Sequence, residues 1–241
     1  MNDDSARAAG DYDTMADAYD TANPYNDLYE RPAILHLAGD VDGATVVDAG
    51  CAAGALTAAL VDRGARVRAF DVSPAMVELA ERRLGDKADV RVADLARPLD
   101  FVDDESVDLV IASLVLHYLQ DWVPTLKEFR RILRPGGKLV FSTHHPAMDW
   151  LQFERPNYFA TELLTDVWTK GGRSFEVRFY RRPLSAIFAA LGEAGLGIDE
   201  IVEPMPLPEL ATQNPEAYQR LTTRPWFLCV RATRDRLTRT G

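Results

Sequence analysis

Residues 45–54 read TVVDAGCAAG, a β-branched run that ends in an acidic residue and a turn of small residues. The run predicts a buried strand, and Leu56, Ala59 and Leu60 predict a helix that follows the turn and ends at Gly64. Small residues in this turn allow a ligand to approach the backbone closely. The N–H groups and the positive dipole end of the helix would face that ligand.

The alternation of short strands and longer helical segments continues from this stretch to Thr143. We expect further strands at 66–71, 89–94, 107–113 and 138–143. Ser73 and Asp121 are expected to cap the two helices between them, and Pro135–Gly137 to end the second. Strands that alternate with helices in this way predict an α/β fold with a mostly parallel, Rossmann-like sheet.

The rest of the 241-residue chain is expected to complete one domain, 1–241, around a core at 45–143. Residues 1–44 carry helical patches and predict an N-terminal cap over the carboxyl edge of the sheet. Residues 144–182 are rich in aromatic side chains and predict a lid-like insertion, with a strand at 174–180. Residues 183–241 predict a helix from Pro183 and two last strands at 198–203 and 226–233.

Composition and charge exclude several classes of protein. The chain is 47% hydrophobic and 27% charged, as in globular domains, and its net charge of −10 disfavours a nucleic-acid partner. The first ten residues lack the pattern of a signal peptide, and the apolar stretch 107–119 is too short to span a bilayer. Cys51 and Cys229 have no metal-ligand spacing, so we expect reduced thiols, no metal site and a cytoplasmic location.

Three acidic residues stand at expected strand ends. Asp71 lies 21 residues after Gly50. At this spacing its carboxylate could accept hydrogen bonds from the ribose hydroxyls of either a dinucleotide or an adenosyl ligand. Asp48 suits a nearby ammonium or sulfonium group better than a pyrophosphate, and Asp94 could accept a hydrogen bond from an adenine amine. With a turn that reads GCAAG rather than GxGxxG, these residues favour S-adenosylmethionine over NAD.

The sequence resembles the class I S-adenosylmethionine-dependent methyltransferases from about Tyr12 to Ala232. The motifs that carry the resemblance are VVDAGCAAGALT, FDVSPAM, VADLARPL, SLVLHYL and LRPGGKLVFST, and the later stretches are similar to a bacterial subgroup with small-molecule substrates. The resemblance implies a seven-stranded sheet with a reversed last strand and helices on both faces. It also implies methyl transfer to N, O or C of a small-molecule acceptor, with S-adenosylhomocysteine as the product. Members of this family usually carry Gly where Ala52 stands.

The resemblance also implies which residues bind the cofactor. Asp48, Gly50 and Gly54 would surround its methionine moiety, Asp71 would hold the ribose, and Asp94 would take the adenine amine. The remaining residues expected at the cofactor are Tyr19, Ala49, Val72, Met76, Leu95 and Ser113. Tyr12 resembles, with Tyr19, the N-terminal aromatic residues that close over the cofactor.

Histidines supply the candidates for a general base on the acceptor. They are His117, His144 and His145, and the last two follow the fifth expected strand. Neighbouring side chains in a strand point oppositely, so one of the pair should face the cleft, and the family pattern favours His145. His117 is the second choice. The aromatic insertion (Trp150, Phe153, Tyr158, Phe159 and Trp168) suits a flat or apolar acceptor.

Two other functions remain open from the sequence, an NAD-dependent dehydrogenase and a non-catalytic adenosyl-binding regulator. A nucleic-acid methyltransferase is disfavoured, because SLVLHY lacks the signatures of adenine- and cytosine-modifying enzymes.

Overall fold

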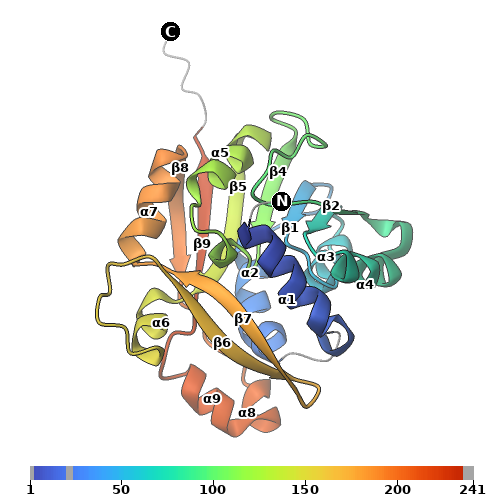
Figure 1. Cartoon of the computed structure of the whole chain (residues 1–241). Coiled ribbons are helices and arrows are strands. Elements are labelled where there is room, and N and C mark those ends of the chain that lie inside the picture. The colour runs from blue at the N-terminus through green and yellow to red at the C-terminus, as the bar shows by residue number, and fades with distance from the viewer. Residues whose placement is uncertain (1–2, 20–23, 236–241) are drawn as a thin grey trace.

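A seven-stranded sheet forms the centre of the computed structural model, which describes residues 3–19 and 24–235 (Figure 1). Its strands are β1 (Thr45–Ala49), β2 (Arg66–Asp71), β3 (Asp89–Val92), β4 (Val107–Ala112), β5 (Leu133–His144), β8 (Leu196–Val202) and β9 (Phe227–Arg234). Their order is β3-β2-β1-β4-β5-β9-β8, with β1 to β5 parallel. The last strand, β9, is antiparallel to both of its neighbours, so the predicted mostly parallel sheet with a reversed last strand is confirmed.

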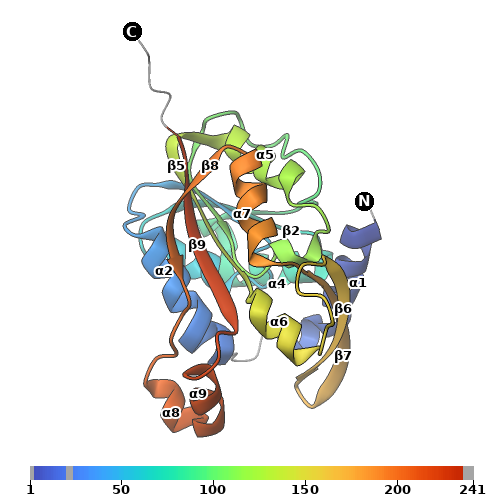
Figure 2. The same cartoon turned by 90° about the vertical axis from the view of Figure 1, so that its left-hand side faces the viewer.

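Helices cover both faces of this sheet, as predicted (Figure 2). One face carries α2 (Arg31–Ala38), α3 (Ala55–Val61) and α4 (Pro74–Leu84), and the other carries α5 (Val123–Ile132) and α7 (Leu184–Glu193). The central strand β4 contributes Leu109 and Ile111 to the first layer and Val110 and Ala112 to the second. Its continuous apolar run is therefore explained by burial on both sides.

Local signals in the sequence account for several element boundaries. The Ser73 hydroxyl accepts a hydrogen bond from Met76 N at the start of α4, and Pro74 occupies the first helical position. Strand β5 begins at Leu133, earlier than the predicted Lys138. Leu133 pairs with Val107 there, and the pairing register then shifts before Leu109 and Lys138.

The carboxyl ends of the parallel strands are covered by elements from three parts of the chain. They are α1 (Asp3–Tyr19), the turn Asn26–Glu30, α6 (Pro146–Gln152), the hairpin β6 (Glu162–Lys170) and β7 (Arg173–Arg181), α8 (Glu209–Gln213) and α9 (Pro215–Leu221). The short helices α8 and α9 were not predicted. The strand expected at 174–180 is β7, which pairs with β6 rather than with the main sheet.

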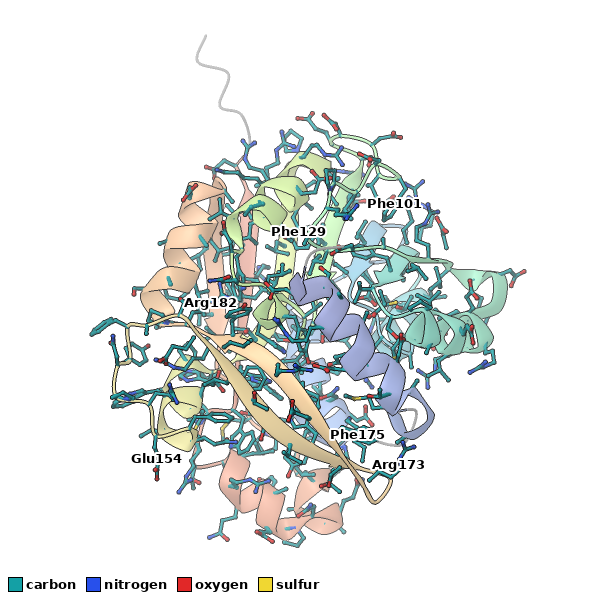
Figure 3. The ribbon with its side chains drawn as sticks, in the orientation of Figure 1. Phe101, Phe129, Glu154, Arg173, Phe175 and Arg182 are labelled. Carbon is teal, nitrogen blue, oxygen red and sulfur yellow. The ribbon has the colours of Figure 1, made fainter. Side chains whose placement is uncertain are left out.

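The hairpin lies across the molecule beside α1 (Figure 3). Arg173 and Phe175 lie near its turn, with the guanidinium 5.1 Å from the ring centroid, and Arg182 lies at the opposite end of β7. Phe175, Val177 and Phe179 point inward and pack with Ala8 and Met15 of α1. The segment predicted as an insertion thus forms, with the N-terminal helix, one cover over the sheet edge. Among the described helices, none is long and apolar enough to cross a bilayer.

Candidate active site

A cavity of about 730 Å³ lies where the carboxyl ends of the parallel strands meet this cover. Its wall includes the turn after β1 and residues at the ends of β2, β4 and β5, together with side chains of α1, α6 and the hairpin. Open α/β sheets place their ligands at this edge. The cavity is therefore the candidate active site.

Asp71, at the end of β2, lies on the cavity wall. Its Oδ2 accepts a hydrogen bond from Ala52 N and its Oδ1 accepts one from Ser73 N, each at 2.9 Å. Burial raises the pKa of this carboxyl, while the backbone N–H groups oppose that shift. A carboxylate offers about four acceptor positions. Asp71 is thus held rigidly and keeps the capacity to accept two further hydroxyl groups.

Asp94, just beyond β3, lies on the same wall. Its Oδ1 accepts hydrogen bonds from Ala96 N at 2.9 Å and from the Ser5 hydroxyl of α1 at 2.5 Å. Its Oδ2 is buried and accepts no hydrogen bond from the described residues, with Arg97 Nε 3.5 Å away. An acceptor atom in this state fits an amine donor of a ligand.

The small residues of the turn between β1 and α3 are explained by the backbone conformation of the turn and by the little space around it. Gly50 (φ 79°) packs so tightly that an added Cβ would lie 2.4 Å from Val115 Cγ2. A Cβ on Gly54, the residue before α3, would lie 3.1 Å from side-chain atoms of Ala80 and Leu84. Gly50 lines the cavity and Gly54 does not, so Gly54 serves helix packing. Ala52 lines the cavity with a φ of 45°, where glycine is favoured.

Asp48, in β1, is 1% exposed and lies on the cavity wall. The Thr57 hydroxyl donates a hydrogen bond of 2.6 Å to its Oδ2. Burial raises the pKa of Asp48 to about 6, and the nearby carboxylates of Asp71 and Glu30 add to the rise. The site therefore holds a carboxylate that a cation would stabilise.

Glu30, which the sequence patterns did not single out, lies beside the end of β4. It is 2% exposed, and its Oε1 accepts hydrogen bonds from the hydroxyls of Ser113, at 2.8 Å, and Ser142, at 2.5 Å. Burial raises its pKa, and these two hydroxyls oppose the rise. The only signal in the sequence was an acidic residue before Arg31 and Pro32, which resembles an ordinary helix start.

A stacked pair of histidines forms another part of the wall. The rings of His117 and His144 have centroids 4.3 Å apart and an interplanar angle of 25°. His144 Nδ1 lies 3.6 Å from Asp149 Oδ1 of α6, and Phe179 meets both rings edge-on. His117 is 1% exposed, and neither of its nitrogens has a hydrogen-bond partner among the described residues. Burial lowers its pKa, with contributions from His144 and Arg182.

The expectation that His145 faces the cleft is wrong, because His145 does not line the cavity. Its Nδ1 accepts a hydrogen bond from Ala147 N at the start of α6, and its Nε2 lies 2.9 Å from Glu203 Oε1. Burial lowers its pKa, while Glu203 opposes the shift. Alternation along the strand does place one member of the pair at the cavity, and that member is His144.

The other residues expected at the cofactor divide into two groups. Val72, Leu95 and Ser113 lie on the cavity wall, whereas Ala49 and Met76 are fully buried behind it. Tyr19 ends α1, and its side chain lies outside the described part of the structure. Tyr12 lines the cavity, and its hydroxyl is 2.7 Å from that of Tyr118.

Much of the cavity wall is aromatic, and its rings come from more elements than the insertion. Of the five aromatic residues expected there, Phe153 and Trp168 lie on the wall, while Trp150, Tyr158 and Phe159 do not. The Tyr158 ring contacts both Trp150, which belongs to α6, and Phe159, which is 75% exposed. The remaining rings on the wall belong to Tyr12, Tyr25, Tyr118, Phe70, Phe179, Trp226 and Phe227.

The site fits an adenosyl cofactor with a cationic end. Asp94, whose Oδ2 accepts no hydrogen bond from the described residues, lines the cavity together with the firmly held carboxylate of Asp71 and the buried Asp48. A pyrophosphate beside Asp48 and Glu30 would be repelled, whereas a sulfonium would be attracted. The observed acceptors thus match S-adenosylmethionine better than a dinucleotide.

Comparisons with known proteins agree with this assignment. Residues 47–141 match the family described as a methyltransferase domain. The chain is 33% identical over 145 residues to malonyl-[acyl-carrier protein] O-methyltransferase of Serratia marcescens, a match that covers 57% of this chain and 50% of that protein. The chain therefore matches about half the length of this curated relative.

Two solved structures have the same fold over most of the chain. The S-adenosylmethionine-dependent methyltransferase from Mesorhizobium loti is 28% identical, with a TM-score of 0.67, and covers 84% of this chain and 96% of its own. A methyltransferase structure from Listeria monocytogenes is 23% identical, with a TM-score of 0.72, and covers 86% and 95%. Residues 47–141 thus match a methyltransferase domain, and the chain has the fold of S-adenosylmethionine-dependent methyltransferases.

Proposed function

We propose that this protein transfers the methyl group of S-adenosylmethionine to a nitrogen, oxygen or carbon atom of a small-molecule acceptor. The observation that carries the proposal is the convergence of Asp48, Asp71 and Asp94 on one cavity that also has an aromatic wall. The acidic side chains suit the cofactor, and the aromatic wall suits a flat or apolar acceptor.

Each part of the cofactor has a partner among these residues. Asp94 Oδ2 would accept a hydrogen bond from the adenine amine, and Asp71 would accept bonds from the ribose hydroxyls. The turn at Gly50 and Ala52, together with Asp48, would surround the methionine end. When bound, the cofactor supplies a methyl group activated by a sulfonium. The protein aligns the acceptor with it and excludes water, which supplies roughly 7–11 kcal/mol in well-oriented reactions.

On the acceptor side, we propose His144 as the general base in place of His145. His144 lies on the cavity wall, and Asp149 lies 3.6 Å from its Nδ1, where a carboxylate would stabilise the imidazolium. His117 stacks on His144, and its lowered pKa keeps its own ring neutral.

We also propose where the protein is located and which class of partner it acts on. Two buried free thiols and a net charge of −10 support a cytoplasmic protein that acts on a small molecule and not on nucleic acid.

Calorimetric titration with S-adenosylmethionine, S-adenosylhomocysteine and NADH tests the cofactor. We expect both adenosyl compounds to bind and NADH not to bind. Binding of NADH alone would favour the dehydrogenase and overturn the proposal.

Methyl transfer is tested with a library of phenols, amines and carboxylic acids in the presence of methyl-labelled cofactor. Transfer of label to one class identifies the acceptor chemistry. Tight binding without transfer to any compound would favour the adenosyl-binding regulator.

A further inference from the structure

Two buried carboxylates, Glu30 and Asp48, lie on the cavity wall with one oxygen each held by hydroxyl groups. Glu30 Oε1 accepts hydrogen bonds from Ser113 and Ser142, and Asp48 Oδ2 accepts one from Thr57. The hydrogen bonds that these two side chains accept from described residues all go to Glu30 Oε1 and Asp48 Oδ2, and none goes to Glu30 Oε2 or Asp48 Oδ1. Both side chains, 2% and 1% exposed, therefore line the cavity and each keep one oxygen that accepts no hydrogen bond from the described residues.

The groups around these carboxylates do not neutralise them. Arg31 lowers the pKa of both carboxyl groups, but its Nη1 also pairs with Asp27 at 2.6 Å. Asp71 is a second negative neighbour of Asp48, and burial together with the negative charge of Glu30 raises the pKa of the Cys229 thiol. Burial of unpaired negative charge is costly, so this part of the cavity favours a positive ligand group.

The position of Glu30 indicates which part of the cofactor would supply that charge. If Asp94 holds the adenine and Asp71 the ribose, the cofactor extends along the strand ends toward β1 and β4. Glu30 lies at that far end, bound to Ser113 directly after β4. The methyl-bearing sulfur would lie in this region, between the adenosyl part and the aromatic wall.

We propose that Glu30, assisted by Asp48, selects the sulfonium form of the cofactor over its neutral thioether product. This inference rests on the proposed function. Methyl transfer forms a bond from carbon to the acceptor and breaks the carbon–sulfur bond, whose electron pair remains on sulfur and cancels its charge. The positive charge passes to the methylated acceptor or leaves as its proton. Loss of the attraction to Glu30 then favours release of S-adenosylhomocysteine.

Binding measurements on Glu30→Gln test the proposal without knowledge of the acceptor. Glutamine has the same shape, and its carbonyl can still accept hydrogen bonds from Ser113 and Ser142. The probes are S-adenosylmethionine, S-adenosylhomocysteine and sinefungin, an analogue in which a protonated amine replaces the sulfonium. Glu203→Gln is the matched control, because Glu203 is 60% exposed and contacts His145 outside the cavity.

We expect Glu30→Gln to weaken binding of the two cationic ligands by about tenfold or more, because an opposite charge nearby shifts a carboxyl pKa by at least about one unit. Binding of the neutral product should weaken less than about threefold, and Glu203→Gln should change none of the three affinities. An equal loss for product and substrate would place Glu30 at the methionine ammonium or in a structural role, and would overturn the inference.

A second measurement uses the unaltered protein. The pKa values of Asp48 and Glu30 are raised in the free protein, and a bound cation would lower them. S-adenosylmethionine should therefore release protons on binding near pH 6 and bind more tightly as the pH rises from 5 to 7. The product should release fewer protons, as measured by calorimetry in buffers of different ionisation enthalpy.

Equal proton release by both ligands would also contradict the charge selection. In that case the adenosyl site and the proposed function would stand, since both ligands would still bind. Failure of both ligands to bind would instead remove the proposed function and the inference with it.

Discussion

At the scale of single residues, two adjacent histidines have different surroundings. His144 lies on the cavity wall beside Asp149, and His145 caps α6 and pairs with Glu203. We predict that His144→Gln lowers the rate of methyl transfer by about 10²–10⁴-fold when the acceptor must lose a proton. His145→Gln should retain most activity. The rate is measured against pH at saturating cofactor, and cofactor affinity by calorimetry should be unchanged in both variants. A larger loss with His145→Gln would return the base role to His145.

Asp71 provides a second residue-level prediction. Asp71→Asn keeps one oxygen acceptor but loses the charge and one acceptor toward the ribose, so cofactor binding should weaken by about 1.5–3 kcal/mol. Circular dichroism checks that the variant is folded, because the side chain also accepts bonds from Ala52 N and Ser73 N. Unchanged affinity in a folded variant would assign Asp71 to holding the turn alone.

At the scale of elements, α1 is attached to the cavity walls by polar side chains. Its Ser5 donates to Asp94, its Tyr12 hydroxyl meets that of Tyr118, and its Asp13 accepts from the Ser73 hydroxyl. Because bound cofactor would lie beside α1, we expect this helix to move when the cofactor exchanges. The tyrosine and serine contacts should therefore slow cofactor release.

The double variant Ser5→Ala with Tyr12→Phe removes two hydrogen bonds of about 1 kcal/mol each, so release of S-adenosylhomocysteine should accelerate about tenfold or more. Stopped-flow displacement measures that rate. Thr14→Ala is the control, because the Thr14 hydroxyl donates to the Asp11 carbonyl within the same helix. Equal rates in the three proteins would show that α1 does not limit exchange.

At the scale of the whole molecule, the buried carboxylate of Asp48 makes stability depend on pH. Its pKa is about 6 in the folded protein against an ordinary 3.8, so the folded state binds the proton more tightly than the unfolded state. The free energy of unfolding should therefore fall as the pH rises from about 4 to 6, by roughly 3 kcal/mol from this group, and then stay lower.

Asp48→Asn should remove most of this dependence. In urea titrations of the free protein, we expect the variant to gain roughly 2–3 kcal/mol over the unaltered protein at pH 7.5 and little at pH 4. It should also bind S-adenosylmethionine more weakly, since the cation loses a charge partner. A variant that is destabilised equally at both pH values would show that the charge of Asp48 is not the cause.

The sequence alone was sufficient for the fold class and for predicting that most of the residues proposed to bind the cofactor lie at one edge of the sheet. Three features of the site are local patterns in the sequence. The apolar run of β1 reflects the burial of one strand, and the small residues of the turn reflect the space around its backbone. Each acidic residue, Asp48, Asp71 or Asp94, marks the end of a single strand. Parallel strands bring their carboxyl ends to one edge, so these residues meet without further information. The pairing of β9 between β5 and β8, in contrast, depends on contacts between segments far apart in the chain.

The positions of Glu30 and of the two neighbouring histidines were decided only by tertiary structure. Glu30 is buried because a turn far from β4 and β5 in the sequence packs its carboxylate against Ser113 and Ser142, and no local pattern encodes that contact. Either histidine of the pair could have faced the cavity, because alternation along a strand separates the two faces but does not say which face meets the ligand. His144 is the one that faces the cavity because α6, the hairpin and His117 pack around it. This packing places the cavity on one side of β5 and Glu203 on the other.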